Sequence, residues 1–389
     1  MIRKRTEPAG PHSAAVEALR GDPRWGDWRW QLRHAARDPQ ALAAWFRAPL
    51  PRAALGPAGT VYPMAVPPYY ASLVRRPAFS DPIFRMCAPD AAELVTGTAE
   101  LEDDPFGEDA HMPAPGLIRR YRDRALVMAT RVCASYCRHC TRKASMGPGR
   151  WGAGDGAPDL PRIAAYLRAH PEIREVLVSG GDPLMLSTAR LEAILRAVRA
   201  APNIEIVRLG TRMPVTLPQR VTPELVRMLR RHHPLWLNTH FNHAAELSPE
   251  AAAACARLAD AGIPLGNQTV LLRGVNDRAA ALEDLFRGLL RIRVRPYYLL
   301  QCDPVRGVGH FRVPLRRGLT LIDGLRRRLT GLAVPTFVVD VPAGGGKVPL
   351  LATGVERWGR GGAWLRGPGG ILVRYPEPGG GLNRGDGRV

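Results

Sequence analysis

Three cysteines lie close together in the run RVCASYCRHCTRK: Cys133, Cys137 and Cys140. The Cys-x3-Cys-x2-Cys spacing offers three thiolate ligands and no fourth. A structural zinc site uses four protein ligands, whereas an iron–sulfur cubane held by three cysteines keeps one iron open to a small molecule. The spacing therefore favours a 4Fe-4S cluster with an open iron. The alternatives are zinc with a distant fourth ligand, or three unrelated buried thiols.

Lysine is scarce, because only Lys4, Lys143 and Lys347 occur among 55 basic residues. Lys347 ends the segment VDVPAGGGKVP, whose glycines allow close approach of the backbone. A lysine amine can form a Schiff base with an aldehyde cofactor such as pyridoxal phosphate, whereas a guanidinium stays protonated. Lys347 is therefore a candidate catalytic residue, against the alternative of a surface lysine in a flexible loop. Val348 follows it, so the phosphate-binding P-loop pattern is not matched.

The composition excludes several classes of protein. With 389 residues the chain can form more than one domain. It has no run of 18 apolar residues, and its charged start lacks a following apolar segment, so we expect neither a membrane span nor a signal peptide. Thiolate ligands that must stay reduced indicate a cytoplasmic location. The net charge is +20, but arginines are spread along the chain among 35 acidic residues, so we expect no nucleic-acid partner.

The middle of the chain alternates short apolar, β-rich runs with amphipathic helical segments, which is typical of βα units in a parallel sheet. The predicted strands span Ala125–Thr130, Glu175–Ser179, Glu205–Leu209, Leu235–Thr239, Pro264–Leu271, Val294–Gln301 and Thr336–Asp340. The predicted helices span Leu160–Ala169, Leu191–Ala200, Pro223–Arg231, Pro249–Ala261, Ala279–Arg291 and Leu315–Leu329. Thr222-Pro223 and Ser248-Pro249 predict helix starts, since each joins a capping residue to a first-turn proline.

Polar, chemically useful residues follow each predicted strand. The strand ends read CASYCRHC, SGGD, GTR, NTHFNH, GNQ, QCD and VDVPAGGGK. A parallel β/α barrel builds its active site from the loops at the carboxyl ends of its strands. Because all seven segments share this property, we predict a complete or partial barrel and not an open doubly wound sheet.

The predicted organisation has four parts. Residues 1–115 form an N-terminal helical cap, with helices across Trp28–Arg37 and Pro39–Arg47, and residues 116–350 form the barrel. Residues 351–376 form a small hairpin from Ala363–Arg366 and Ile371–Tyr375, and the glycine-rich residues 377–389 form a disordered tail.

Several collinear motifs resemble one enzyme family. The cluster loop CASYCRHCTRK, with LPQRVTPELV, HPLWLNTHFNH, LADAGIPLGNQTVLLRGVND, RVRPYYLLQCD and VPTFVVDVPAGGGKVP, is similar to lysine 2,3-aminomutases, which are radical S-adenosylmethionine enzymes. The resemblance implies an α/β fold with a partial (β/α)6-type TIM-like barrel and an isomerase activity. It implies three cofactors: a 4Fe-4S cluster, S-adenosyl-L-methionine and pyridoxal 5'-phosphate. It also implies an electron donor such as flavodoxin or ferredoxin, and a homo-oligomer.

The resemblance assigns roles to individual residues. Cys133, Cys137 and Cys140 would hold the cluster. The residues implied to contact S-adenosylmethionine are Ser179, Gly180, Gly181, Asp182, Arg212, His240 and Gln268. Lys347 would hold pyridoxal phosphate, with Arg120 and Arg124 near its phosphate. Arg142 would pair with the substrate carboxylate. Asp303 and Asp340 would bind the distal ammonium of lysine, and they disfavour a substrate that lacks this charge.

Three departures from the family pattern concern the substrate and the assembly. Leu300 stands where the clostridial type carries a tyrosine near the pyridoxal ring. Arg278 replaces a cysteine after GVND, and the C-terminal cysteine cluster is absent, so we expect no zinc between subunits. The short relatives that modify a protein lack the QCD and VVD-x-P-x-GGGK combination, and its presence favours a free amino acid as substrate.

We expect the enzyme to convert L-lysine to β-lysine. The alternative is an arginine 2,3-aminomutase of natural-product biosynthesis, because a guanidinium could use the same two aspartates. Glutamate is disfavoured, since two acids would repel its side chain. A radical enzyme that modifies RNA is a remote alternative. Lys347 discriminates between the two classes, since an RNA modifier has no need of pyridoxal phosphate. A catalytically idle cluster-binding module is the weakest alternative, because every expected catalytic part has a matching residue.

Overall fold

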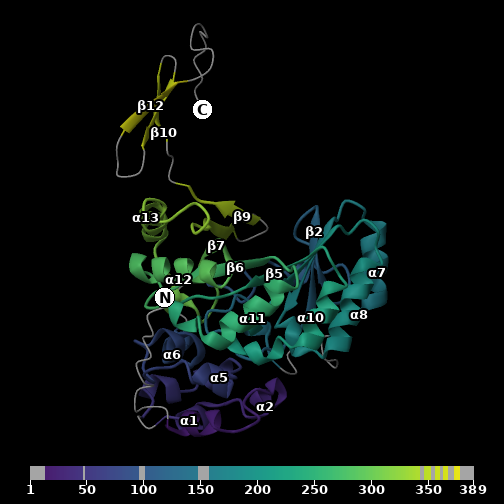
Figure 1. Ribbon diagram of the computed structural model, residues 1–389, viewed down its shortest axis with the longest axis vertical. Helices are drawn as coiled ribbons and strands as arrows, with labels where there is room; N and C mark the ends of the chain where they lie inside the picture. The colour runs from purple at the N-terminus through teal and green to yellow at the C-terminus, as the bar shows by residue number, and fades with distance from the viewer. Residues whose placement is uncertain are drawn as a thin grey trace.

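The computed structural model describes residues 14–46, 49–95, 101–147, 157–341, 346–351, 355–359, 362–366 and 372–376. At its centre is a nine-stranded sheet whose strands follow their order in the chain (Figure 1). Strands β2 to β8 are parallel, and the antiparallel strands β1 and β9 form the two edges. The strand bounds are β1 Leu117–Ile118, β2 Arg124–Thr130, β3 Glu175–Gly180, β4 Ile206–Gly210, β5 Leu235–Thr239, β6 Leu265–Leu271, β7 Arg295–Gln301, β8 Thr336–Val341 and β9 Gly346–Pro349.

The connections between the parallel strands confirm the predicted barrel. Each connection contains one main helix. In chain order these helices are α7 Leu160–Ala169, α8 Thr188–Arg199, α10 Pro223–Arg230, α11 Pro249–Asp260, α12 Ala279–Arg291 and α13 Leu315–Arg326. A doubly wound sheet reverses its strand order at a switch point, and this sheet does not. The sheet curls, with helices on its outer face (Figure 1). Six βα units and a seventh strand therefore make a partial (β/α)6-type barrel.

The alternation of side chains along a strand explains why the concave side stays open. In β3, Val176 and Val178 are fully buried beneath the helices, whereas Leu177 and Ser179 line a cavity on the opposite face. Neighbouring residues of a strand point to opposite faces of the sheet. The two valines thus pack against the outer helices, and the alternate residues of the strand face the cavity.

The predicted helix starts are confirmed by their caps. The Ser248 hydroxyl accepts a hydrogen bond from the Ala251 amide at 3.0 Å, and the Thr222 hydroxyl accepts one from the Leu225 amide at 3.2 Å. These side chains satisfy amides that have no partner within the helix. The predicted strand bounds agree with the structure to within one residue at most ends, because the β-rich runs are short and sharply bounded.

The N-terminal region is helical, but its helices are shorter and more numerous than predicted. They are α1 Ala14–Arg20, α2 Trp28–Arg33, α3 Pro39–Ala43, α4 Ala58–Val61, α5 Pro68–Ala71 and α6 Pro82–Cys87. The helix predicted across 28–37 ends early, because the Asp38 carboxylate caps α3 through the Ala41 amide and Pro39 occupies its first turn. Residue 47 of the second predicted helix lies outside the described residues. Helices α5 and α6 contact segments that follow β4 and β5, on the carboxyl side of the sheet.

A separate three-stranded antiparallel sheet follows the barrel. It contains β10 Val355–Gly359, β11 Gly362–Arg366 and β12 Leu372–Pro376, and it stands clear of the barrel (Figure 1). Strands β11 and β12 are the predicted hairpin, with Ala363 opposite Tyr375, and β10 was not predicted. The predicted tail at 377–389 lies outside the described residues, and the four-part division of the chain stays a prediction. Within the described ranges, no helix is long and apolar enough to cross a membrane.

Candidate active site

A cavity of about 910 Å³ opens on the concave side of the sheet, and every candidate residue singled out in the sequence lines it. These are Arg120, Arg124, Cys133, Cys137, Cys140, Arg142, Ser179, Gly180, Gly181, Asp182, Arg212, His240, Gln268, Asp303, Asp340 and Lys347. Segments separated by more than 200 residues thus meet in one pocket, as the barrel prediction requires.

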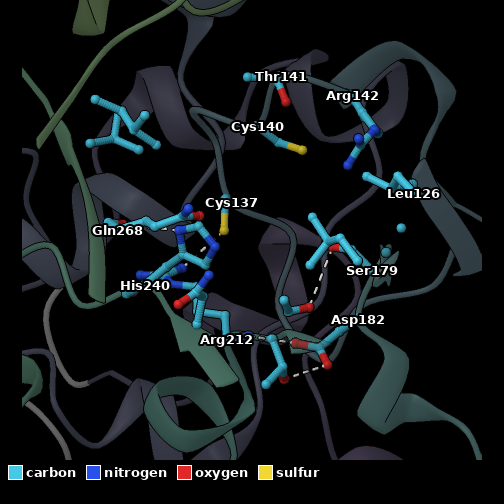
Figure 2. Close-up of a pocket in the computed structure, with 18 of the residues that line it drawn as sticks. Leu126, Cys137, Cys140, Thr141, Arg142, Ser179, Asp182, Arg212, His240 and Gln268 are labelled. Atoms are coloured by element: carbon cyan, nitrogen blue, oxygen red, sulfur yellow. Dashed lines mark hydrogen bonds between the residues drawn. The ribbon is translucent and has the colours of Figure 1, made fainter. Parts of the chain in front are cut away.

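The three candidate cluster cysteines lie on the loop that follows β2. Figure 2 shows the sulfur atoms of Cys137 and Cys140 in the same pocket as Ser179, His240 and Gln268. Among the described residues, no three His, Cys, Asp or Glu side chains converge on a single metal ion. A cubane does not need such convergence, because each cysteine binds a different iron. Burial raises the pKa of the Cys140 thiol to about 11, so binding of iron would displace its proton.

The SGGD segment packs directly against the start of the cluster loop. Gly180 has a φ of +115°, and a Cβ atom there would lie 2.5 Å from the Thr130 carbonyl oxygen. A Cβ atom on Gly181 would lie 2.5 Å from the Val132 carbonyl oxygen. Only glycine allows this approach of two backbones. These glycines therefore set the distance between the SGGD segment and the cluster loop.

Asp182 makes several hydrogen bonds within the protein. Its carboxylate accepts from the Thr211 hydroxyl at 2.7 Å and from the amides of Leu184 and Arg212 at 3.0 and 2.7 Å. Burial raises the pKa of this carboxyl to about 6, although these hydrogen bonds favour the ionised form. The Asp182 carboxylate thus ties the loops after β3 and β4 together below the cavity (Figure 2).

Arg212 connects the cluster loop to a buried polar network. Its Nη1 donates to Cys137 Sγ at 3.1 Å, and its Nη2 donates to the Tyr70 hydroxyl at 2.9 Å and to Glu246 Oε1 at 2.6 Å. Its Nε donates to the carbonyl of His240 at 3.1 Å. Glu246 is fully buried, so this ion pair is shielded from water. The guanidinium is therefore held rigidly against Cys137, a candidate cluster ligand.

His240 and Gln268 lie side by side on the loop after β5 and on β6. The Nδ1 of His240 donates to the Gln268 carbonyl at 3.0 Å, which leaves Nε2 as an acceptor. Burial, together with the Arg212 charge, lowers the pKa of His240 to about 4. The imidazole is therefore neutral near pH 7.

Lys347 lies in the edge strand β9, directly opposite Asp340 of β8 in the antiparallel register. Its amine forms an ion pair with Asp340 Oδ2, and Arg120 Nη2 donates to Asp340 Oδ1 at 3.1 Å. The Nε of Arg120 is buried and has no hydrogen-bond partner among the described residues. Arg124 lies close by, with its guanidinium carbon 4.0 Å from the centre of the Tyr121 ring. An amine with two arginines nearby suits a phosphorylated aldehyde.

Asp303 follows β7 and lines the same pocket as Asp340. Burial and the negative charge of Asp340 raise the pKa of Asp303 to about 7. Within the described part of the chain, Asp303 has no ion-pair partner, whereas Asp340 has two. A carboxyl held in this state becomes fully ionised when a cation is bound beside it.

Arg142 forms an ion pair that the sequence did not predict. Its Nε and Nη2 donate to the two carboxylate oxygens of Glu108, each at 2.6 Å. Glu108 lies 34 residues earlier, in a segment assigned to the N-terminal cap, and it lines the cavity. No motif or spacing in the sequence marks this pair, because it depends on how the two segments meet in the fold.

Lys143 was noted in the sequence only for its rarity, and it proves to be a buried residue at the end of the cluster loop. Its amine pairs with Glu93 at 2.6 Å and donates to the carbonyls of Arg138 and Gly307 at 2.8 and 2.9 Å. Arg138 forms a second ion pair with the same carboxylate. The amine thus joins the cluster loop to the loop that carries Asp303.

The cluster loop at the carboxyl end of a partial barrel defines a class of protein. The family description "Radical SAM superfamily" matches residues 127–285, and "Lysine-2,3-aminomutase" matches residues 322–385. The chain is therefore a radical S-adenosylmethionine protein, and this class implies a 4Fe-4S cluster and S-adenosylmethionine.

Curated relatives specify the family further. An L-lysine 2,3-aminomutase of Clostridium subterminale is 46% identical over 92% of this chain and 85% of its own length. The L-lysine 2,3-aminomutase of Bacillus subtilis is 42% identical over 91% of this chain and 75% of its own. A glutamate 2,3-aminomutase of Clostridioides difficile is 40% identical over 84% of this chain and 77% of its own. The chain belongs to the lysine 2,3-aminomutase family, and its enzyme class is isomerase.

Proposed function

We propose that this aminomutase uses pyridoxal 5'-phosphate and moves the α-amino group of a free basic amino acid to the β-carbon, with L-lysine as the first candidate substrate. The observation that carries the proposal is the position of Lys347 opposite Asp340, with Asp303 in the same cavity. An amine suited to an aldehyde cofactor thus lies beside two carboxylates suited to a cationic side chain.

The cluster loop and the strands beside it would hold the radical-generating group. Cys133, Cys137 and Cys140 would bind three irons, and S-adenosylmethionine at the remaining iron would supply a carbon radical able to abstract a hydrogen atom. His240 and Gln268 line the cavity next to this loop and offer an acceptor nitrogen and an amide to orient the nucleoside. The protein's part here is to position groups and to exclude water.

The residues around Lys347 fit pyridoxal phosphate. The bound cofactor would supply the carbonyl group that holds the migrating nitrogen. The amine of Lys347 would bind it, and the guanidinium groups of Arg120 and Arg124 would neutralise its phosphate. The Nε of Arg120 is buried and has no hydrogen-bond partner within the described ranges, and a phosphate oxygen could accept from it.

The charges along the cavity support a basic amino acid. Arg142 would bind the substrate α-carboxylate, and Asp303 with Asp340 would bind the distal cation. The glutamate 2,3-aminomutase relative shows that the family includes an acidic substrate. Here burial, and then the charge of Asp340, already raises the pKa of Asp303, and a third carboxylate would add further repulsion.

Arginine is the second candidate, and Leu300 favours it. Leu300 lies in β7 and lines the cavity beside Tyr298. An aliphatic side chain leaves more space than an aromatic ring at this place. A guanidinium is longer and wider than an ammonium, and it could engage both aspartates in a bidentate manner.

Incubation of the anaerobically reconstituted enzyme with L-lysine and L-arginine in parallel tests the proposal. The mixture contains S-adenosylmethionine, pyridoxal phosphate and a chemical reductant, and products are resolved by mass spectrometry after derivatisation of their amines. A flavodoxin or ferredoxin then replaces the chemical reductant to test the electron donor. We expect β-lysine. β-Arginine alone would favour the second candidate, and Leu300→Tyr would then be expected to shift the preference towards lysine.

Two further outcomes would contradict the proposal. Release of 5'-deoxyadenosine without either product would mean that the radical chemistry works on another substrate. A purified protein that shows no pyridoxal absorbance after loading would remove the cofactor from the proposal, and it would favour the radical RNA-modifying alternative.

A further inference from the structure

The ion pair between Glu108 and Arg142 has a specific geometry. A guanidinium presents five N–H donors in a planar fork. Glu108 takes the edge formed by Nε and Nη2, with both distances at 2.6 Å. The other edge of the guanidinium, formed by Nη1 and the second hydrogen of Nη2, is not used by this pair. Arg142 can therefore bind one carboxylate of the protein and still offer a two-donor edge to another.

The Arg142 side chain and its Glu108 partner lie at the wall of the cavity. Both line the cavity, and their side chains are only 14% and 19% exposed for Glu108 and Arg142. Figure 2 shows the Arg142 side chain extending from the cluster loop towards Leu126 of β2. Arginine side chains have many rotamers, and ordering one in place costs conformational entropy. A fixed partner removes this cost from the binding of a ligand.

The charge on Glu108 is secure at neutral pH. Burial raises its pKa, but the charge and hydrogen bonds of Arg142 outweigh burial and lower the pKa of this carboxyl below its ordinary value. Arg120 and Lys347 act in the same direction, so Glu108 lies within the field of the proposed pyridoxal site. It therefore stays ionised and remains the counterion of Arg142.

We infer that Glu108 is a positioning residue for substrate recognition: it fixes Arg142 so that the guanidinium edge that Glu108 does not use receives the α-carboxylate of the amino acid. Glu108 thus determines the preference for an amino acid over an amine that lacks the carboxylate. This inference rests on the proposed function and adds to it a residue that no motif identifies.

A comparison of two ligands tests the inference. L-Lysine and 1,5-diaminopentane share the distal ammonium, but only L-lysine has the carboxylate. The dissociation constants of both are measured by calorimetry on enzyme loaded with cluster and pyridoxal phosphate, for the wild type, Glu108→Gln and Glu108→Asp. We expect Glu108→Gln to weaken L-lysine about tenfold or more, the scale of one charge-assisted hydrogen bond. The dissociation constant of the diamine should change by less than about twofold. For L-lysine, the dissociation constant of Glu108→Asp should lie between those of the wild type and Glu108→Gln.

A control variant and turnover measurements make the outcomes decisive. Glu172 also pairs with an arginine, Arg119, but neither residue lines the cavity, so Glu172→Gln should change neither constant. KM for L-lysine should rise in Glu108→Gln more than kcat falls. If Glu108→Gln lost affinity for both ligands equally, the role of Glu108 would be merely structural. If the variant bound L-lysine more tightly, Glu108 would compete with the substrate for Arg142. Either result overturns the inference. Failure of the wild type to form a β-amino acid would instead overturn the proposed function.

Discussion

Lys347 and Asp340 face each other across the antiparallel pair β8–β9, and their side chains form an ion pair at the rim of the cavity. The amine proposed to bind pyridoxal phosphate therefore shares its counterion with the site proposed for the substrate cation. Arg120 adds a second positive partner to the same carboxylate. If the amine of Lys347 held the cofactor, Asp340 would lose this ion pair and could bind the substrate cation.

Replacement of Lys347 tests its covalent role. Lys347→Arg keeps a cation opposite Asp340, so we expect the fold to remain intact, but a guanidinium cannot bind the aldehyde. Activity should fall by about 10³-fold or more, as expected when a group that binds covalently is removed. The measurements are the visible absorbance of the protein loaded with pyridoxal phosphate and the rate of β-amino acid formation. If Lys347→Arg kept the visible absorbance of pyridoxal phosphate bound to a lysine, the assignment of Lys347 as the cofactor lysine would be contradicted.

Asp303 should make substrate binding depend on pH. Its pKa in the ligand-free protein is about 7, well above the ordinary value of 3.8, owing to burial and then to Asp340. The carboxyl is protonated below pH 7 and ionised above it, so affinity for a cationic side chain should rise between pH 6 and 8. The same shift means that ligand-free protein loses stability as pH rises from about 4 to 7, because the folded state binds the extra proton.

Asp303→Asn should abolish this pH dependence. Removal of one partner of a buried charge pair costs about 3 kcal/mol, so kcat/KM for L-lysine should fall by about 100-fold. Calorimetric titrations of both proteins across this pH range provide the check. A pH profile that is the same in the variant and in the wild type would assign the dependence to another group.

Arg212 should tune the reduction potential of the cluster. Its Nη1 donates to the sulfur of Cys137, and hydrogen bonds to cluster ligands stabilise the reduced, more negative state. Arg212→Lys should therefore lower the midpoint potential, as measured by redox titration with electron paramagnetic resonance. Arg220→Lys is the control, since Arg220 is also buried and its hydrogen bonds go to the carbonyls of Leu184 and Leu186. Equal potentials in wild type and Arg212→Lys would refute the effect.

Glu93 should be essential for stability. It is fully buried and pairs with both Arg138 and Lys143, so Glu93→Gln leaves two buried cations without their counterion. The expected loss in the free energy of unfolding is about 3–5 kcal/mol. Chemical denaturation of the cluster-free protein measures it. The exposed pair of Arg174 and Glu205 offers a comparison, since Glu205→Gln should cost less than about 1 kcal/mol.

The parts of this molecule that follow from local chemistry could be predicted from the sequence. The Cys133 loop, the polar strand ends and the caps at Thr222 and Ser248 each depend on residues that are neighbours in the chain. The candidate residues follow the carboxyl ends of parallel strands. Because these ends meet at the same edge of the sheet, the residues come together in one cavity.

Other features depend on contacts between distant segments, and the sequence did not reveal them. The glycine run before Lys347 suggested a loop, yet Lys347 lies in β9, since pairing with β8 overrides the local preference. The partners Glu108 and Arg142, like Glu93 and Lys143, carry no pattern of their own. Strand β10 was missed, because the adjacent charged residues Glu356 and Arg357 interrupt the apolar residues of Val355–Gly359.

The buried amine of Lys143 has a consequence for how the substrate preference of this enzyme can change. It is bonded to the cluster loop and to Gly307, four residues after Asp303. The carboxylate proposed to bind the far end of the amino acid and the cysteines proposed to bind the cluster thus lie on two loops that share one buried amine. We expect a longer or shorter side chain to be accommodated away from this link, at Leu300 or on the β8–β9 hairpin. Diversification of substrates within this scaffold should therefore concentrate at those two places.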